Sequence, residues 1–110
     1  MWYAEGLGIR VVPEFDNPGH VRAVGLDPEF TDAIRCFNTD FAYPVPNAYT
    51  VNGGSPTGAL DPSYDKVFDL LRGVFTDLNS LFKDNMIHLG GDEVYKTCFD
   101  ENPNLKTWMS

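Results

Sequence analysis

An amphipathic stretch between two short apolar runs is the feature that most limits what this chain can fold into. Over residues 62–83 the apolar positions recur three and four residues apart, which gives a helix one wide apolar face: Val67, Phe68, Leu70, Leu71, Val74, Phe75, Leu78, Leu81 and Phe82. Asp61 is a favourable N-cap, and Pro62 suits the first helical position. The sequence therefore predicts a helix over residues 62–83.

The two flanking runs have the composition of buried strands. Residues 8–15 are rich in β-branched and aromatic residues, and residues 86–90 begin with Met86-Ile87-His88-Leu89. Pro13 cannot donate a ladder hydrogen bond, so the first strand is expected to lose pairing near its end. The order strand, helix, strand predicts an α/β fold with two parallel strands joined by a right-handed crossover.

The stretch between the first strand and the helix, residues 16–60, contains many prolines and glycines together with several aromatic residues. Structureless loops of this length are uncommon and are usually functional. Parallel strands end at the same edge of a sheet, so this loop and the turn after residues 86–90 are predicted to lie on the same side.

Two adjacent carboxylates, Asp92 and Glu93, follow the second strand and are preceded by Gly90 and Gly91. Glycines at such a position let backbone or ligand come close. Adjacent residues on extended backbone point in opposite directions. One carboxyl group could then hold a proton while the other stays ionised, which suits an acid beside an electrostatic stabiliser. The alternative is a polar turn with no chemical role.

Polar residues also follow the first strand. His20 comes after Pro18-Gly19 and is either a hydrogen-bond partner of a catalytic carboxylate or a solvent-exposed turn histidine. Of Asp16 and Glu14, one is expected to line the site and the other to pair with Arg10 or to cap a loop. His88 lies within the second apolar run and is predicted to be a core residue with its polar atoms satisfied.

Composition excludes some partners. The net charge is −8, from 16 acidic residues against 8 Lys and Arg, and there is no basic cluster. Nucleic acid and anionic membranes are therefore poor partners. No apolar stretch approaches the length of a membrane span.

Two further questions stay open at the level of single residues. Cys36 and Cys98 could be buried thiols, a disulfide or metal ligands. A cation site is conceivable, because four residues could supply oxygens and one imidazole, although their spacing does not require a metal: Asp16, His20, Asp92 and Glu93. We expect no metal.

Two segments together resemble a known family. Gly8-Ile9-Arg10-Val11-Val12-Pro13-Glu14-Phe15-Asp16-Asn17-Pro18-Gly19-His20 and His88-Leu89-Gly90-Gly91-Asp92-Glu93-Val94 are similar to the signature segments of the β-N-acetylhexosaminidases, the family 20 glycoside hydrolases. The resemblance covers nearly the whole chain, with a poor match over residues 37–59. It implies a (β/α)₈ TIM barrel, which needs roughly 250 residues. Residues 1–110 would then be a partial catalytic domain, roughly from strand 3 to the start of helix 4, and inactive alone.

The resemblance also implies an activity and roles for four residues. Family members hydrolyse terminal non-reducing N-acetyl-β-D-hexosamine residues of glycoconjugates or chitooligosaccharides with retention, and the substrate's acetamido oxygen is the nucleophile. By position, Glu93 resembles the general acid and base, and Asp92 the residue that orients the acetamido group. His20 resembles the histidine that contacts the glutamate, and Asp16 a supporting carboxylate. No cofactor or metal is implied.

The same resemblance extends to the cysteines and the setting. Cys36 and Cys98 look like a disulfide pair of the lysosomal and secreted enzymes. The expected partner is a glycan ending in N-acetylglucosamine or N-acetylgalactosamine, and the full-length protein could form a homo- or heterodimer. The alternatives are a catalytically silent carbohydrate-binding or interaction protein that retains the scaffold, and a hydrolase with a metal-bound water.

Overall fold

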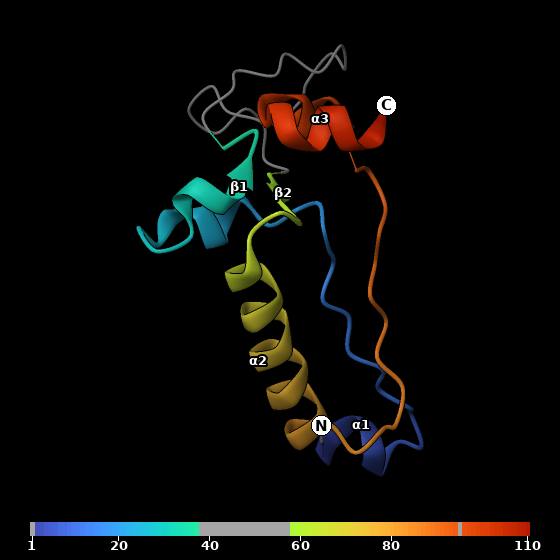
Figure 1. Ribbon diagram of the computed structural model, residues 1–110. Coiled ribbons are helices and arrows are strands. Elements are labelled where there is room, and N and C mark those ends of the chain that lie inside the picture. Colours follow the sequence, from blue (N-terminus) through green and yellow to red (C-terminus); the bar gives the residue numbers. More distant parts are fainter. Residues whose placement is uncertain (1, 38–57, 95) are drawn as a thin grey trace.

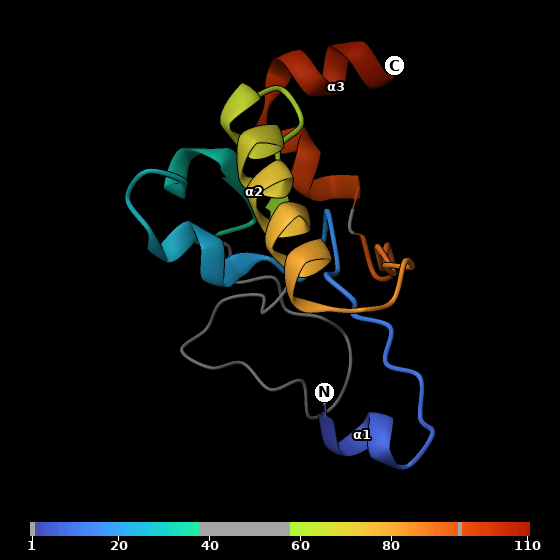
Figure 2. The ribbon, with the colours of Figure 1, turned by 90° about the horizontal axis from the view of Figure 1, so that it is seen from below.

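The computed structural model describes residues 2–37, 58–94 and 96–110, and the chain extends over 48 × 36 × 28 Å. Its elements in chain order are α1 (Trp2–Gly6), the 3₁₀ helices η1 (Arg22–Leu26) and η2 (Thr31–Ala33), strands β1 (Ile34–Arg35) and β2 (Ala59–Leu60), helix α2 (Asp65–Leu81), the 3₁₀ helix η3 (Lys96–Glu101) and helix α3 (Pro103–Met109). Figure 1 shows α2 running back beside two extended segments, and Figure 2 shows α1 set apart from the C-terminal end of α2.

Helix α2 lies inside the range that the apolar spacing predicts, but it begins at Asp65 rather than at residue 62. The Asp61 side chain does not cap it. Instead Asp61 Oδ1 accepts a hydrogen bond from the Ser63 N–H at 2.9 Å, which closes a turn before the helix. The helix ends at Leu81, where the Phe82 N–H donates to the Leu78 carbonyl.

The two predicted strands are present only as a short parallel contact. Residues 8–15 and 86–90 form no continuous strands, and a single parallel bridge joins them, between Glu14 and His88. Three backbone hydrogen bonds flank the bridge: His88 N–H to Pro13, Phe15 N–H to His88, and Asn17 N–H to Leu89. Pro13 has no N–H to donate. Among the described residues, no backbone hydrogen bond joins residues 10–12 to residues 84–87, so the ladder stops there.

Helix α2 is the connection between these parallel segments (Figure 1). The Phe15 and Phe75 rings meet edge to face, with centroids 6.2 Å apart, so Phe15 points toward the helix. Because side chains alternate along an extended segment, Glu14 and Asp16 point to the opposite side. The acidic side chains therefore lie on the face turned away from α2.

The stretch over residues 16–60, predicted to be an irregular loop, contains a small folded unit. Strands β1 and β2 pair antiparallel, with Ile34 opposite Leu60 and Arg35 opposite Ala59. The main core lies between this pair, η1, η2 and the start of α2 and consists of Val21, Ala33, Ile34, Leu60 and Val67. Residues 38–57 of the predicted loop lie outside the described residues.

A disulfide joins Cys36, directly after β1, to Cys98 in η3. It decides among the options that the cysteine spacing leaves open. Helix α3 begins at Pro103, with Asn102 as its N-cap, as Asn-Pro sequences favour. Within the described part of the chain, no helix has both the length and the apolarity to cross a bilayer.

Candidate active site

The end of the parallel contact brings the acidic residues of both segments together. The Gly91 N–H donates to Asp16 Oδ1 at 2.7 Å. Gly90 has a φ of +68° and packs so closely on Asp16 that a Cβ there would lie 2.0 Å from Asp16 Oδ1. A glycine is required because any side chain would displace Asp16. Residues 90–93, which we call the acid turn, are thus held against the first segment.

His20 faces Glu93 and also lies near Asp16. His20 Nε2 is 3.2 Å from Glu93 Oε2 and 3.8 Å from Asp16 Oδ2. The Asp16 side chain is only 21 % exposed, whereas that of Glu93 is 59 % exposed. Asp16 is therefore built into the structure, and Glu93 remains open to a ligand while still touching the imidazole.

Asp92 approaches the same imidazole. One ligand atom from each of Asp16, His20 and Asp92 lies within 4.8 Å of the others. The prediction that Asp92 and Glu93 point in opposite directions assumed extended backbone, but Glu93 has a φ of +50°. This left-handed residue turns the chain, so both carboxylates reach toward His20.

Backbone strain is concentrated here. Only three non-glycine residues in the described ranges have a positive φ, and His20 and Glu93 are two of them, at +58° and +50°. Each such residue costs on the order of 1–3 kcal/mol, and such costs are characteristic of functional sites. His20 and Glu93 contact each other, so both strained backbone conformations occur at a single contact.

Two sets of hydrogen bonds to backbone carbonyls hold the segments around the site, and neither was expected from the sequence. The Asn17 side-chain amide donates to the carbonyls of Phe15 and Leu89, at 3.0 and 3.1 Å, and so ties the two segments together. The Leu60 N–H donates to the Pro18 carbonyl at 2.8 Å, which fastens the turn before His20 to β2. In the sequence, the only indication that Asn17 ties the two segments together is its position between Asp16 and Pro18.

A buried polar cluster lies where β1, the turn before α2 and Asn102 meet. Asp61 is fully buried and accepts hydrogen bonds from Ser63 and from Asn102, the latter at 2.8 Å. Arg35 Nε lies 3.0 Å from Asp61 Oδ2. Together with the disulfide, this cluster joins β1, the start of α2 and the segment that comes after the acid turn. Asp61 looked like a helix cap, so sequence reasoning missed this role.

Three other predictions change. Arg10 pairs with Asp84, not with Asp16 or Glu14, and its hydrogen bonds lower the pKa of Asp84 to about 2. Glu14 pairs with His88 instead, at 3.0 Å. His88 is exposed rather than buried, because its face is turned away from α2.

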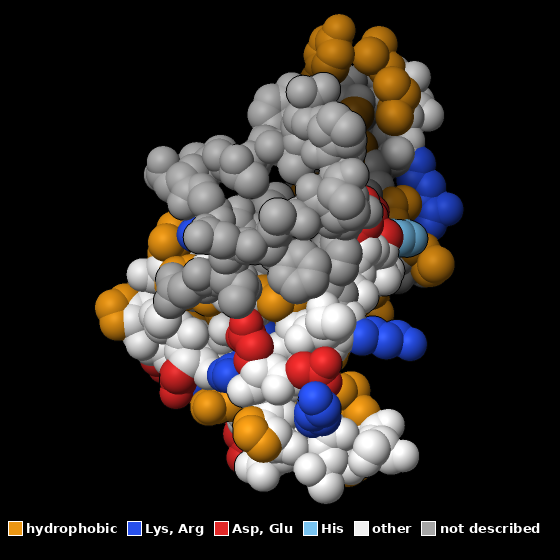
Figure 3. All heavy atoms as spheres, turned by 90° about the horizontal axis from the view of Figure 1, so that it is seen from above, with side chains coloured by type: hydrophobic (Ala, Val, Ile, Leu, Met, Phe, Trp, Pro, Cys, Tyr) orange, Lys and Arg blue, Asp and Glu red, His pale blue; other side chains and the backbone are white. Residues whose placement is uncertain are grey.

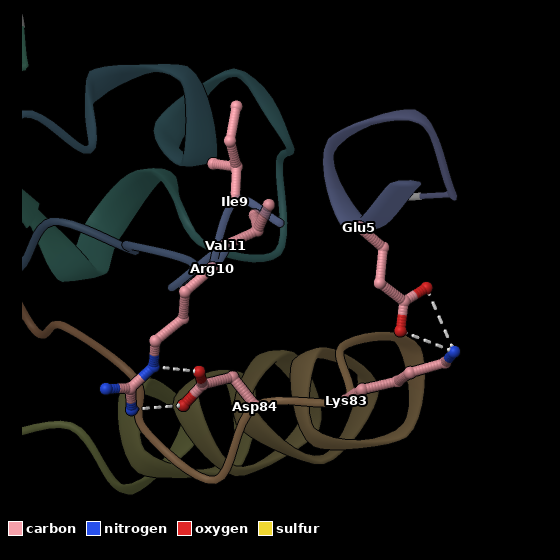
Figure 4. A pocket seen from close by; sticks show the side chains of 6 residues that line it. All are labelled: Glu5, Ile9, Arg10, Val11, Lys83 and Asp84. Atoms are coloured by element: carbon pink, nitrogen blue, oxygen red, sulfur yellow. Dashed lines mark hydrogen bonds and ion pairs between the residues drawn. The ribbon is translucent and has the colours of Figure 1, made fainter. Parts of the chain in front are cut away.

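A cavity of about 210 Å³ lies at the other end of the first segment. Figure 4 shows that its charged side chains already point toward partners, Arg10 toward Asp84 and Lys83 toward Glu5. On the face seen in Figure 3, the Lys and Arg side chains are dispersed rather than gathered into one patch. The acid turn and its partners are therefore the candidate site.

Comparison with known proteins finds a family that matches the whole chain. The model of the glycosyl hydrolase family 20 catalytic domain matches residues 1–110. The chain is 38 % identical over 109 residues to beta-hexosaminidase subunit A1 of Dictyostelium discoideum, covering 98 % of this chain and 18 % of that protein. It is 34 % identical over 113 residues to beta-hexosaminidase subunit beta of Rattus norvegicus, with 97 % and 18 % covered.

A third relative is a probable beta-hexosaminidase of Arthroderma benhamiae, 33 % identical over 110 residues, with 98 % of this chain and 17 % of that protein covered. The chain thus spans less than a fifth of the length of these relatives. No solved structure gives a significant match.

Proposed function

This chain belongs to the catalytic domain of glycosyl hydrolase family 20, and on that basis we propose that it supplies the acid turn of a β-N-acetylhexosaminidase. The proposed reaction is hydrolysis of terminal non-reducing N-acetyl-β-D-hexosamine residues of glycoconjugates or chitooligosaccharides. The chain would contribute roughly strand 3 to the start of helix 4 of a (β/α)₈ barrel. Active sites of such barrels lie at the C-terminal ends of the strands, where the acid turn lies here.

The proposed mechanism retains configuration and uses the substrate's own amide. The acetamido oxygen attacks the anomeric carbon as the bond to the leaving oxygen breaks, and Glu93 gives its proton to that oxygen. Glu93 then removes a proton from the water that opens the cyclic intermediate. Asp92 orients the acetamido N–H and stabilises the positive charge that develops on this group.

One observation carries this proposal: His20 Nε2 lies 3.2 Å from Glu93 Oε2. These residues are far apart in the sequence, and both have a positive φ. The imidazole can hold the glutamate in one orientation, which a proton donor requires. Asp16 supports the arrangement by holding the Gly91 N–H and by lying near His20.

The test replaces Glu93 by glutamine in the complete catalytic domain. Loss of a general acid typically costs about 10²–10⁴-fold. We expect a loss of this size on an alkyl glycoside, whose leaving group needs protonation, and a smaller loss on a nitrophenyl glycoside. Glu29→Gln, which changes an exposed acid away from the site, is the matched control. Equal, unchanged turnover in both variants would refute the acid role.

A second variant tests Asp92. We expect Asp92→Asn to reduce turnover of N-acetyl substrates far more than turnover of a substrate that lacks the acetamide. An equal loss on both would count against the proposed role. Binding of N-acetylglucosamine without hydrolysis by the unmutated protein would instead favour the silent carbohydrate-binding alternative.

A third measurement concerns metal. Asp16, His20 and Asp92 are spaced closely enough to share a cation. We propose that the reaction needs none, so activity should survive exhaustive chelation. Activity lost on chelation and restored by one divalent metal would replace the substrate-assisted mechanism by a metal-dependent one.

We also propose a lysosomal or secreted location. The Cys36–Cys98 disulfide supports it, because disulfides persist in oxidising compartments. The rat relative is named as a subunit beta and a mouse relative as a subunit alpha, which supports a homo- or heterodimer for the whole protein. Residues 1–110 alone are not expected to turn over substrate.

A further inference from the structure

We propose that His88 is a positioning residue of the acid turn and that Glu14 competes with the Gly90 N–H for the same nitrogen of His88. Protonation of His88 would then release the acid turn. This inference rests on the proposed function, since it concerns how Glu93 is held for catalysis.

The geometry places two partners on one atom. His88 Nδ1 accepts a hydrogen bond from the Gly90 N–H at 3.1 Å. The same Nδ1 lies 3.0 Å from Glu14 Oε2. Glu14 and His88 are the residues joined by the parallel bridge, so their side chains stand next to each other on the face turned away from α2.

One nitrogen cannot satisfy both partners at once. If Nδ1 carries a lone pair, it accepts from Gly90, and the ionised Glu14 faces that lone pair with no proton between them. If Nδ1 carries a proton, as in the imidazolium and in one of the two neutral tautomers, it donates to Glu14, and the Gly90 N–H loses its acceptor. Only the neutral tautomer that is protonated on Nε2 therefore holds Gly90.

The Gly90 contact bears on the site because Gly90 begins the acid turn that carries Glu93. The amides of Gly90 and Gly91 are held one after the other, by His88 and by Asp16. Both glycines have positive φ, and glycine adopts many backbone conformations readily, so the turn depends on these contacts to keep its conformation. A misplacement of about 1 Å can cost about 10²-fold in rate, so release of Gly90 would impair the approach of Glu93 to a substrate.

The charged groups near His88 are both acidic. In the described part of the chain, residues 88–89 take backbone hydrogen bonds from the segment over residues 13–17, whose charged side chains on this face are Glu14 and Asp16. Of the two, Glu14 contacts His88 Nδ1, at 3.0 Å. An imidazolium carries a proton on Nδ1, so protonation of His88 should exchange the Gly90 contact for the Glu14 contact and lower turnover.

Three variants of the complete catalytic domain test this inference, with kcat and KM measured across pH. In His88→Asn, the side-chain oxygen can stand where Nδ1 stands and accept from Gly90, but it cannot be protonated. We expect kcat within about threefold of the parent and a weaker fall at acid pH. His88→Leu offers no acceptor, and we expect kcat to fall by about tenfold or more with little change in KM.

Glu14→Gln removes the competing charge and keeps the shape. We expect a smaller loss of turnover at acid pH, because no carboxylate then competes with the Gly90 N–H for Nδ1. Equal impairment of His88→Asn and His88→Leu would overturn the inference. An unchanged acid limb in Glu14→Gln would overturn it as well.

A readout without substrate separates this inference from the proposed function. If the parent fails to hydrolyse an N-acetylhexosaminide, the proposed function fails. The Gly90 amide can still be followed by NMR in glycine-labelled protein. A shift of that resonance with the titration of His88, absent in His88→Asn, supports the exchange. A resonance that ignores the titration overturns it.

Discussion

Replacing the buried carboxylate of Asp61 by an amide, Asp61→Asn, should destabilise the protein severely. Asp61 is fully buried, and Asp61 Oδ2 faces Arg35 Nε at 3.0 Å and Asn102 Nδ2 at 2.8 Å. Asn102 Nδ2 donates a hydrogen bond to this oxygen, whereas Arg35 Nε makes no hydrogen bond among the described residues and contributes its charge. An amide NH₂ at this position would point a donor at the Asn102 donor and would remove the charge that offsets Arg35.

The magnitude depends on the contacts that remain. Breaking a buried ion pair costs about 3–5 kcal/mol. The amide oxygen of asparagine can still accept from the Ser63 N–H and hydroxyl, as Asp61 Oδ1 does at 2.9 and 2.7 Å. We therefore expect a loss near the lower limit, about 3 kcal/mol.

Urea denaturation measures this loss, with Asp32→Asn as the matched control. The Asp32 side chain is 62 % exposed and pairs with Lys66 on the surface, where solvent screens the pair, so its replacement should cost far less. Adding Arg35→Met to Asp61→Asn should recover part of the loss, because no unpaired buried charge is left. Equal costs for Asp61→Asn and Asp32→Asn would refute the reasoning.

Single contacts give three further predictions. Gly90→Ala places a methyl group 2.0 Å from Asp16 Oδ1 and should lower turnover by about tenfold or more. Gly73→Ala, whose new methyl group meets no atom of the described residues within 4 Å beyond its chain neighbours and the adjacent helix backbone, should stabilise α2 by about 1 kcal/mol. Equal turnover in these two variants would contradict the packing argument. Replacing Cys36 and Cys98 together by serine opens a loop with a sequence separation of 62 and should cost about 4 kcal/mol, measured by unfolding with and without reductant. An unchanged midpoint would show that the disulfide does not constrain the unfolded chain. The Arg10 hydrogen bonds hold the pKa of Asp84 at about 2, below the ordinary value of about 3.9, so the stability that this pair contributes should be present above about pH 4 and lost as the pH falls toward 2. A carbon-detected NMR titration of Asp84 with a midpoint near its ordinary value would disprove the pairing.

The apolar spacing of residues 67–82 and the Asn102-Pro103 cap determine local structure, and both helices appear where these patterns lie. Such patterns involve residues close together in the chain, so they can be recognised without knowledge of the rest of the fold. The segments over residues 8–20 and 88–94 together resemble the family that the comparisons show.

Contacts between distant residues could not be predicted in the same way. The local sequence predicts that Asp61 caps the helix, but Asp61 is buried in contact with Arg35 and Asn102. The local sequence predicts that His88 is a core residue, but one nitrogen of His88 contacts both Glu14 and Gly90. In each case the partner is chosen by packing, which local propensity does not encode.

The sequence by itself determined the order of strand-like segment, helix and strand-like segment, and with it the side on which the polar residues gather. Only the tertiary structure decided that His20 meets Glu93 at 3.2 Å and that Asp92 turns toward the same imidazole. The physical reason is the left-handed backbone at His20 and Glu93. Extended geometry would aim the adjacent carboxylates apart, and packing between segments that are distant in the sequence stabilises the strained alternative.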